Sequence, residues 1–124
     1  MHKQELIHSH ILVAMLCGWE PRKPSKLHPD GYMELEVEGQ TLPEIVANDD
    51  ILEQLPYSTD WNYFMAAWDT FEENQVVIGE DCTEELDTIR NNIVQAILCC
   101  DLELAFKEMV RGVNTINQLK LQET

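Results

Sequence analysis

The chain has 124 residues and carries 23 Asp and Glu against 8 Lys and Arg, a formal net charge of −15. This length fits one domain, and a hydrophobic fraction of 44% argues against a disordered chain. Such an acidic surface repels phosphates and anionic lipids, so direct binding to nucleic acid or to a membrane is disfavoured. No apolar stretch of the sequence approaches the ~20 residues needed to cross a bilayer.

The acidic residues are concentrated in the middle of the chain. Residues 27–89 contain 17 Asp and Glu and neither Lys nor Arg, whereas both flanking segments are close to charge balance. A solvated face normally mixes both signs, because interspersed charges limit self-repulsion. This acidic region therefore indicates either a highly soluble surface or a surface for a basic partner, and the composition alone leaves both readings open.

The N-terminal residues predict a helix followed by a loop. Residues 3–17 have apolar side chains at helical spacing, and Gly18 suits the left-handed conformation that ends a helix. Residues 20–29 form a basic connector with three prolines, which predicts a loop. The inner face of the helix is predicted to comprise Leu6, Ile7, His10, Ile11, Ala14 and Met15.

The segment Gly31–Gly39 has the clearest strand pattern in the chain. Three apolar residues alternate with Glu34, Glu36 and Glu38, so one face is apolar and the other is a row of carboxylates. Carboxylates two residues apart on a strand lie roughly 6.6 Å from each other. Such a row is stable only where it faces water or a cationic partner.

Three further elements are predicted between residues 41 and 79. Thr41 and Glu44 have the spacing of a capping box, which predicts a short helix over residues 42–47, ended by residues 48–50. A longer helix begins at residues 58–60, and residues 75–79 are predicted to form a short buried strand. The core stripe of the longer helix is Trp61, Phe64, Met65, Trp68 and Phe71.

The C-terminal part predicts one helix that begins near Thr83 and another that begins after Asp101. Residues 93–100 either continue the first helix or form a strand after the two asparagines at 91 and 92. Asp101 is suited to cap the last helix, which runs from Leu102 to about Leu119. Its inner face is predicted to comprise Leu102, Phe106, Met109, Val113 and Ile116.

These elements together predict an α+β fold. We expect a single domain over residues 1–124, with a small, mostly antiparallel sheet packed with helices in an α/β/α sandwich-like arrangement. The basic connector at 20–29 and the acidic region at 27–89 are its main compositional features. Four cysteines, at positions 17, 82, 99 and 100, lack metal-ligand spacing and are expected to be reduced and mostly buried.

One part of the sequence resembles a known family. The run Leu55–Trp61, followed by Met65, Trp68 and residues 71–73, resembles a signature of small phage and prophage proteins grouped as the phage ABA sandwich domain. Residues 16–19 and 104–110 resemble the exit of the leading helix and the closing helix of those proteins. The resemblance covers about half of the chain. It implies an antiparallel sheet between helices, with a strand at 75–78, and a phage or prophage origin.

The sequence also departs from that pattern. Residues 113–117 lack an aromatic cluster, and the carboxylate row at 34, 36 and 38 fits poorly in a sheet covered on both faces. Either that strand is an edge, or one face is left open there. The resemblance carries no catalytic residues, and we predict neither a metal nor a cofactor.

The charge and the resemblance together predict a phage-encoded acidic binding protein that is not an enzyme. Its partner is expected to be a basic host protein in the cytoplasm, such as a nucleic-acid-binding defence nuclease, which it would inhibit in the manner of an anti-CRISPR protein through nucleic-acid mimicry. The candidate contact residues are Glu34, Glu36, Glu38, Asp49, Asp50, Glu53, Glu72, Glu73, Glu80, Asp81, Glu84 and Glu85.

Two alternatives remain open. The first is a phage protein, either an enzyme or a ligand-sequestering protein, with a small-molecule pocket between helices and sheet. The second is an assembly protein that self-associates through the strand edge at residues 31–39, although its carboxylate row makes pairing between copies costly. The pocket of the first alternative would be walled by Trp19, Tyr32, Tyr57, Trp61 and Tyr63.

Overall fold

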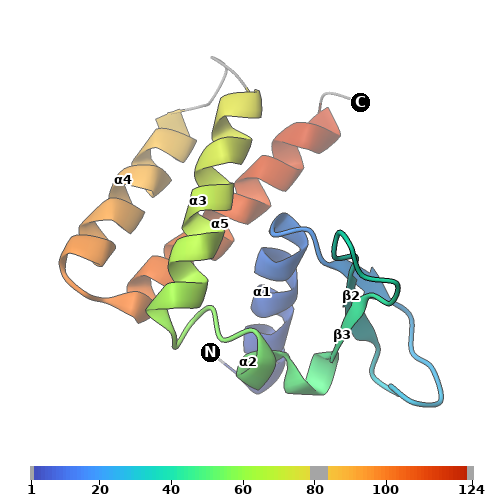
Figure 1. Ribbon diagram of the computed structural model, residues 1–124. Helices are drawn as coiled ribbons and strands as arrows, with labels where there is room; N and C mark the ends of the chain where they lie inside the picture. The colour runs from blue at the N-terminus through green and yellow to red at the C-terminus, as the bar shows by residue number, and fades with distance from the viewer. Residues whose placement is uncertain (1, 79–83, 123–124) are drawn as a thin grey trace. The chain divides into compact units, whose positions relative to one another are not determined.

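The structure, a computed structural model, describes residues 2–78 and 84–122 (Figure 1). Its helices and small three-stranded antiparallel sheet confirm the predicted α+β class and are consistent with a single domain. The contacts divide the chain into two compact units, Met1–Pro56 and Tyr57–Thr124, which are described separately below as unit 1 and unit 2. The sandwich-like layering remains a prediction.

Unit 1 begins with helix α1, Lys3–Leu16, as predicted. Gly18 has a φ of +101°, so it adopts the left-handed conformation expected at the end of this helix. The buried face differs in part from the prediction, because Met15 is 44% exposed and Val13 is fully buried in its place. The buried residues of α1 are Ile7, Ser9, His10, Val13 and Ala14.

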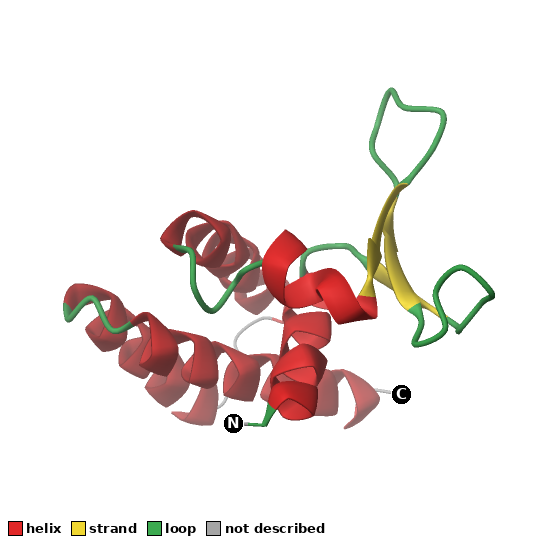
Figure 2. Ribbon diagram, turned by 90° about the horizontal axis from the view of Figure 1, so that it is seen from below, coloured by secondary structure: helices red, strands yellow, loops and turns green. Residues whose placement is uncertain are grey.

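The sheet of unit 1 has three short strands, β1 (Glu20–Arg22), β2 (Tyr32–Leu35) and β3 (Glu44–Ala47). They lie in the order β1-β2-β3, and both pairs are antiparallel. The loops 23–31 and 36–43 leave opposite ends of this sheet (Figure 2). Helix α1 contacts β1, and the short helix α2, Ile51–Gln54, contacts β3. Both outer strands therefore have helical neighbours within unit 1.

Two predictions for this sheet are wrong. Residues 20–29 are not entirely a loop, because residues 20–22 form β1; Pro21 is tolerated there since an edge strand needs no second row of hydrogen bonds. Residues 42–47 do not form a helix, because residues 44–47 form β3. Here the β-branched residues Ile45 and Val46 pair with β2, and this pairing outweighs the local capping signal at Thr41.

The predicted carboxylate row on one strand is also wrong. Strand β2 ends at Leu35, so Glu36 and Glu38 lie in the following loop and only Glu34 lies on the strand. Strand β2 is the central strand of the sheet rather than an edge. Met33, at its centre, is fully buried, as the alternation of apolar and acidic residues predicts.

A short helical segment closes unit 1. Residues Asn48–Asp50 form a 3₁₀ turn, and helix α2 spans Ile51–Gln54. Ile51 is fully buried and α2 contacts α1, which anchors the segment to the core of this unit. The turn approaches the sheet closely at Gly31, where the absence of a side chain permits this contact. A Cβ at this glycine would lie 2.9 Å from Asn48 Nδ2 and 3.0 Å from the carbonyl oxygen of Arg22.

Unit 2 contains the helices α3 (Trp61–Ile78), α4 (Glu84–Leu98) and α5 (Leu102–Gln122). Helix α3 begins where predicted, but the predicted strand at 75–79 is wrong, because residues 75–78 continue this helix and Gly79 lies outside the described residues. Residues 93–98 are helical, which decides between the two readings of that segment. Asp101 caps α5 as predicted, since its Oδ1 accepts a hydrogen bond of 3.1 Å from the backbone N–H of Leu104.

The core of unit 2 is formed where its helices meet at Gly112. A Cβ on this glycine would lie 2.7 Å from Cε2 and Cζ of Phe71 and 3.2 Å from Cγ2 of Ile89. Phe71 and Ile89 are fully buried, so α3, α4 and α5 meet at a point that only glycine fits. The predicted core residues Phe64, Phe71, Phe106, Met109, Val113 and Ile116 are buried, whereas Met65 is exposed and Leu102 and Trp61 are half-buried.

Candidate functional site

The candidate carboxylates are divided between the two units. Six lie in unit 1 and four in unit 2, while Glu80 and Asp81 lie outside the described residues. Glu34 and Glu72 are half-buried. The exposed candidates are Glu36, Glu38, Asp49, Asp50, Glu53, Glu73, Glu84 and Glu85.

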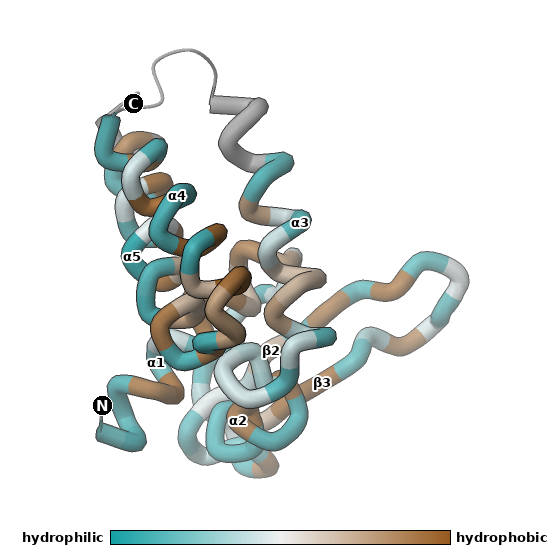
Figure 3. Tube along the Cα trace, turned by 90° about the vertical axis from the view of Figure 1, so that its left-hand side faces the viewer, coloured by the Kyte–Doolittle hydropathy of each residue, from teal (hydrophilic) through white to brown (hydrophobic). Residues whose placement is uncertain are grey.

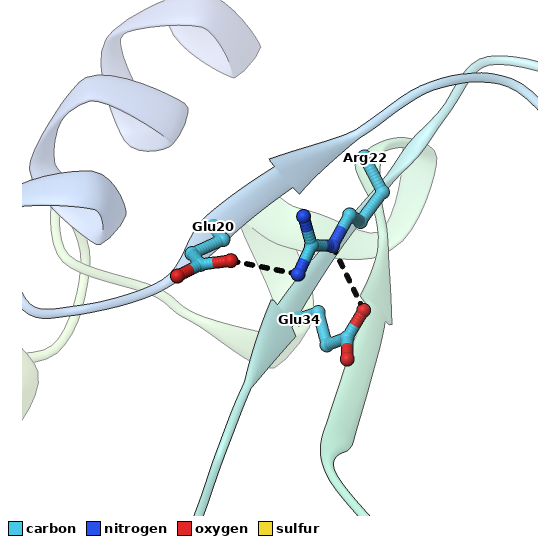
Figure 4. A network of polar contacts seen from close by, with 3 residues as sticks. All are labelled: Glu20, Arg22 and Glu34. Atoms are coloured by element: carbon cyan, nitrogen blue, oxygen red, sulfur yellow. Dashed lines mark hydrogen bonds and ion pairs between the residues drawn. The ribbon is translucent and has the colours of Figure 1, made fainter.

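Glu34 belongs to a network of three charged residues on the sheet (Figure 4). It lies directly opposite Glu20 in the β1–β2 register, an arrangement that brings two like charges together. Arg22 offsets this repulsion, because its Nε donates to Glu34 Oε2 at 2.9 Å and its Nη2 donates to Glu20 Oε2 at 2.7 Å. The hydrogen bond to Glu34 raises the pKa of Arg22 above its usual value, and the charges of Glu34 and Glu20 add to this effect.

Glu72 is also held by an arginine. The Nε of Arg90 on α4 lies 3.0 Å from both carboxylate oxygens of Glu72 on α3. Arg22 and Arg90 both belong to the segments that flank the acidic region. Each therefore neutralises one carboxylate of that region, and Glu34 and Glu72 are the candidates least free to contact a partner.

In the part of the chain that the structure describes, the exposed candidates have no such arginine partner. Within the described part of the chain, the ion pairs of the acidic region are those of Glu34 and Glu72. In unit 1 this leaves five candidates without an ion pair to Lys or Arg among the described residues. They are Glu36, Glu38, Asp49, Asp50 and Glu53.

Three of the predicted carboxylates line one hollow, although they do not share a strand. The acidic hollow, lined by Glu34 and residues 36–43, has a volume of about 560 Å³. Apolar and charged residues both occur in the loop that joins β2 and β3 (Figure 3), and among them Leu42 is 77% exposed. The hollow therefore offers carboxylates beside an accessible apolar side chain, an arrangement that suits the charged head and the aliphatic stem of Lys or Arg.

Asp49 faces a second carboxyl group, which the sequence did not reveal. A hydrogen bond to Asp30 is the main reason that the pKa of Asp49 is raised, with smaller contributions from burial and from the charges of Asp30 and Asp50. The two carboxyls line a hollow of about 300 Å³ between α1 and the 3₁₀ turn. Asn48 holds this turn in place, because its Nδ2 donates to the carbonyl oxygen of Asp30 at 3.0 Å.

The cysteines correct another prediction. Cys99 and Cys100 are exposed and Cys17 is half-buried, so the thiols in the described residues are not mostly buried, and Cys82 lies outside those residues. Cys99 and Cys100 are exposed because they form the turn between α4 and α5 rather than a core segment. Across residues 2–78 and 84–122, no three His, Cys, Asp or Glu side chains gather in a way that could hold a metal ion. In the same ranges, no helix combines the length and apolar character needed to cross a membrane.

Of the five aromatic residues proposed as pocket walls, two are buried, Tyr32 and Trp61 are half-buried, and Tyr63 is exposed. Trp19 and Tyr57 are buried, and the ring of Tyr57 packs edge-to-face on that of Tyr63 with 6.0 Å between centroids. The ring of Trp61 packs on that of Phe64 in the same way at 5.7 Å. Edge-to-face contacts of this kind are a favourable arrangement of aromatic rings, and the small-molecule pocket stays a prediction.

No family model, curated protein or solved structure matches this chain. The resemblance to the phage ABA sandwich domain therefore remains a prediction, and the strand that it implies at 75–78 is helical. Sequence reasoning missed Glu20, Arg22, Asp30 and Glu44 as neighbours of the candidate carboxylates. Only the two consecutive β-branched residues Ile45 and Val46 could have indicated a strand at Glu44.

Proposed function

We propose that the protein is a non-enzymatic, acidic binding protein of phage or prophage origin. It binds a basic surface that a host protein otherwise uses for nucleic acid, such as that of a defence nuclease, and thereby inhibits it. The observation that carries this proposal is the group of exposed, uncompensated carboxylates in unit 1. In a protein selected only for solubility, Lys and Arg would be interspersed among them.

The electrostatics of the acidic region support binding to a basic protein. Uncompensated carboxylates repel one another, and a cationic surface relieves this repulsion when it binds. Opposite net charges also speed the diffusional encounter of two proteins, and this effect weakens as the ionic strength rises. Arg22 fixes the position of Glu34, so the neighbouring acidic hollow begins at an ordered strand.

The test is capture of bacterial proteins on the immobilised chain at low salt, followed by identification of the retained proteins and competition with duplex DNA. We expect the retained proteins to be nucleic-acid-binding proteins. Duplex DNA should displace them, and their retention should decrease strongly as the salt concentration rises. Retention of proteins without a nucleic-acid-binding surface, or retention that DNA does not affect, contradicts the proposal.

Two quadruple variants with equal changes in net charge make this test specific. The first removes candidate charges in unit 1 and should weaken binding about tenfold or more, because these groups face the partner. The second removes exposed charges that are not candidate contact residues and should have a much smaller effect. The first variant is E36Q/E38Q/D50N/E53Q, and the control is E5Q/D69N/D87N/E103Q. Equal losses in both variants would show that net charge alone determines binding.

A further inference from the structure

Strand β3 lies at one edge of the sheet in unit 1. In the order β1-β2-β3, strand β3 pairs only with β2 among the described residues. Its sequence, Glu44 to Ala47, contains neither Lys nor Pro, two residues that often protect exposed strand edges, and its one charged residue is Glu44. Ile45 on this strand is 51% exposed.

The hydrogen-bond register determines which backbone groups point out of this edge. The backbone N–H of Asn48 donates to the carbonyl oxygen of Gly31 at 3.1 Å, whereas the N–H of Gly31 donates to His28. This single bond places Gly31 and Asn48 at a hydrogen-bonded position of the β2–β3 ladder. Hydrogen-bonded and non-hydrogen-bonded pairs alternate along an antiparallel ladder. In the observed register, Ile45 and Glu34 are therefore a non-hydrogen-bonded pair. The N–H and C=O of Ile45 point away from β2, toward the free edge.

The opposite edge of the sheet does not offer the same groups. Glu20 and Arg22 pair with Glu34 and Tyr32 in β2, whose backbone groups point toward β1 by the same alternation. The residue of β1 that faces outward is then Pro21, which has no backbone N–H to donate. Only the β3 edge carries both a donor and an acceptor at its centre.

We propose that the edge of β3 receives an extended basic segment of the partner, which adds to the sheet as a fourth strand. This inference rests on the proposed function and names the part of the partner that is bound. Backbone hydrogen bonds to Ile45 provide the pairing, and the acidic hollow next to the start of β3 receives a Lys or Arg side chain.

The charges near this edge select the occupant. Glu44 on β3 is exposed, and Glu36 and Glu38 lie in the preceding loop. A second copy of the chain would bring another net charge of −15 and another Glu44 to the same edge, so self-pairing is unfavourable. Side chains alternate along a strand, so a segment that alternates Arg or Lys with a β-branched residue places its cations beside Glu44 and its apolar residues beside Ile45.

The experiment uses the full chain and a labelled eight-residue peptide of alternating Arg and Val, with binding followed by fluorescence anisotropy. The matched control is the same peptide with N-methyl groups on the residues that would donate to β3, which keeps every charge but removes the edge hydrogen bonds. We expect N-methylation to weaken binding about tenfold, the effect of losing one or two net hydrogen bonds.

A pair of protein variants provides a second readout. Ile45→Lys places a charge on the edge, whereas Leu27→Lys makes the same charge change at an exposed apolar residue in the loop 23–31. We expect Ile45→Lys to weaken peptide binding about tenfold more than Leu27→Lys. In the wild type, the amide signal of Ile45 should gain protection from hydrogen exchange when the peptide binds.

The outcomes separate this inference from the proposed function. The peptide could bind in a salt-dependent manner without a selective effect of N-methylation or of Ile45→Lys. That result overturns strand addition but leaves the proposal of an acidic binding protein intact. If the peptide does not bind while DNA-displaceable basic proteins are still captured, strand addition is again overturned alone. If neither the peptide nor basic proteins bind at low salt, both proposals are wrong.

Discussion

Gly112→Ala tests the packing at the centre of unit 2. In an exposed helix, this substitution stabilises a protein by about 1 kcal/mol, because Ala has the higher helix propensity. At Gly112 the added methyl group would lie 2.7 Å from two ring carbons of Phe71 and 3.2 Å from Cγ2 of Ile89. Overpacking of a well-packed core costs about 1–3 kcal/mol. Because three atoms are crowded at once, we expect a net loss of about 1–2 kcal/mol.

The assay is urea denaturation followed by far-ultraviolet circular dichroism, with two companion variants. Asn114→Ala lies on the same helix at an exposed position and should raise the stability slightly, which isolates helix propensity. Phe71→Leu removes the ring carbons nearest to Gly112, so Gly112→Ala should become neutral or stabilising in that background. If Gly112→Ala stabilises the wild-type protein as much as it would an exposed helix, the packing argument is refuted.

Three further predictions concern single residues. Cys100 has a φ of +56° and follows α4, at a position where Gly is preferred. Cys100→Gly should therefore raise the free energy of unfolding by about 1 kcal/mol, whereas Cys99→Gly should not, as measured by urea denaturation. Burial lowers the pKa of His10 below its usual 6.5, although Leu6 O accepts a hydrogen bond from its ring. The unfolded chain therefore binds the proton more readily, so stability should fall as the pH drops below about 6.5, and His10→Asn should flatten this dependence. Arg22→Gln should lower the thermal midpoint of unfolding more than Lys23→Gln, because Arg22 bonds to both Glu20 and Glu34 and offsets their repulsion. Equal midpoints for the two variants would mean that the repulsion between these carboxylates is small.

The correct and incorrect predictions for the elements have a common physical cause. Helices α1, α3 and α5 could be predicted because each has many apolar residues at helical spacing together with an end signal such as Gly18 or Asp101. The predictions for 42–47 and 75–79 rested on only a few residues each. In short segments, pairing with a distant strand or the continuation of a neighbouring helix outweighs local preference. The fold class therefore followed from the long helical segments and from the strand pattern at residues 31–39.

The same limit applies to the candidate site. The excess of carboxylates in residues 27–89 can be counted from the sequence. Which of them are neutralised depends on contacts between residues far apart, 12 positions for Arg22 and Glu34 and 18 for Arg90 and Glu72. The convergence of Glu34, Glu36 and Glu38 on one hollow likewise depends on where β2 ends, which the uninterrupted alternation of residues 33–38 conceals.

Salt should have opposite effects on the stability and on the binding of this protein. Repulsion among the uncompensated carboxylates of unit 1 destabilises the folded chain, and added salt screens exposed charges within a Debye length of about 8–10 Å. We therefore expect the thermal midpoint of the free protein to rise between about 20 and 300 mM NaCl. The affinity for a basic partner should fall over the same range, because screening also weakens attraction across the interface. The E36Q/E38Q/D50N/E53Q variant should show a smaller salt response in both measurements. A midpoint that falls with salt would mean that the carboxylates are compensated in the folded chain, and the main support for a basic partner would then be lost.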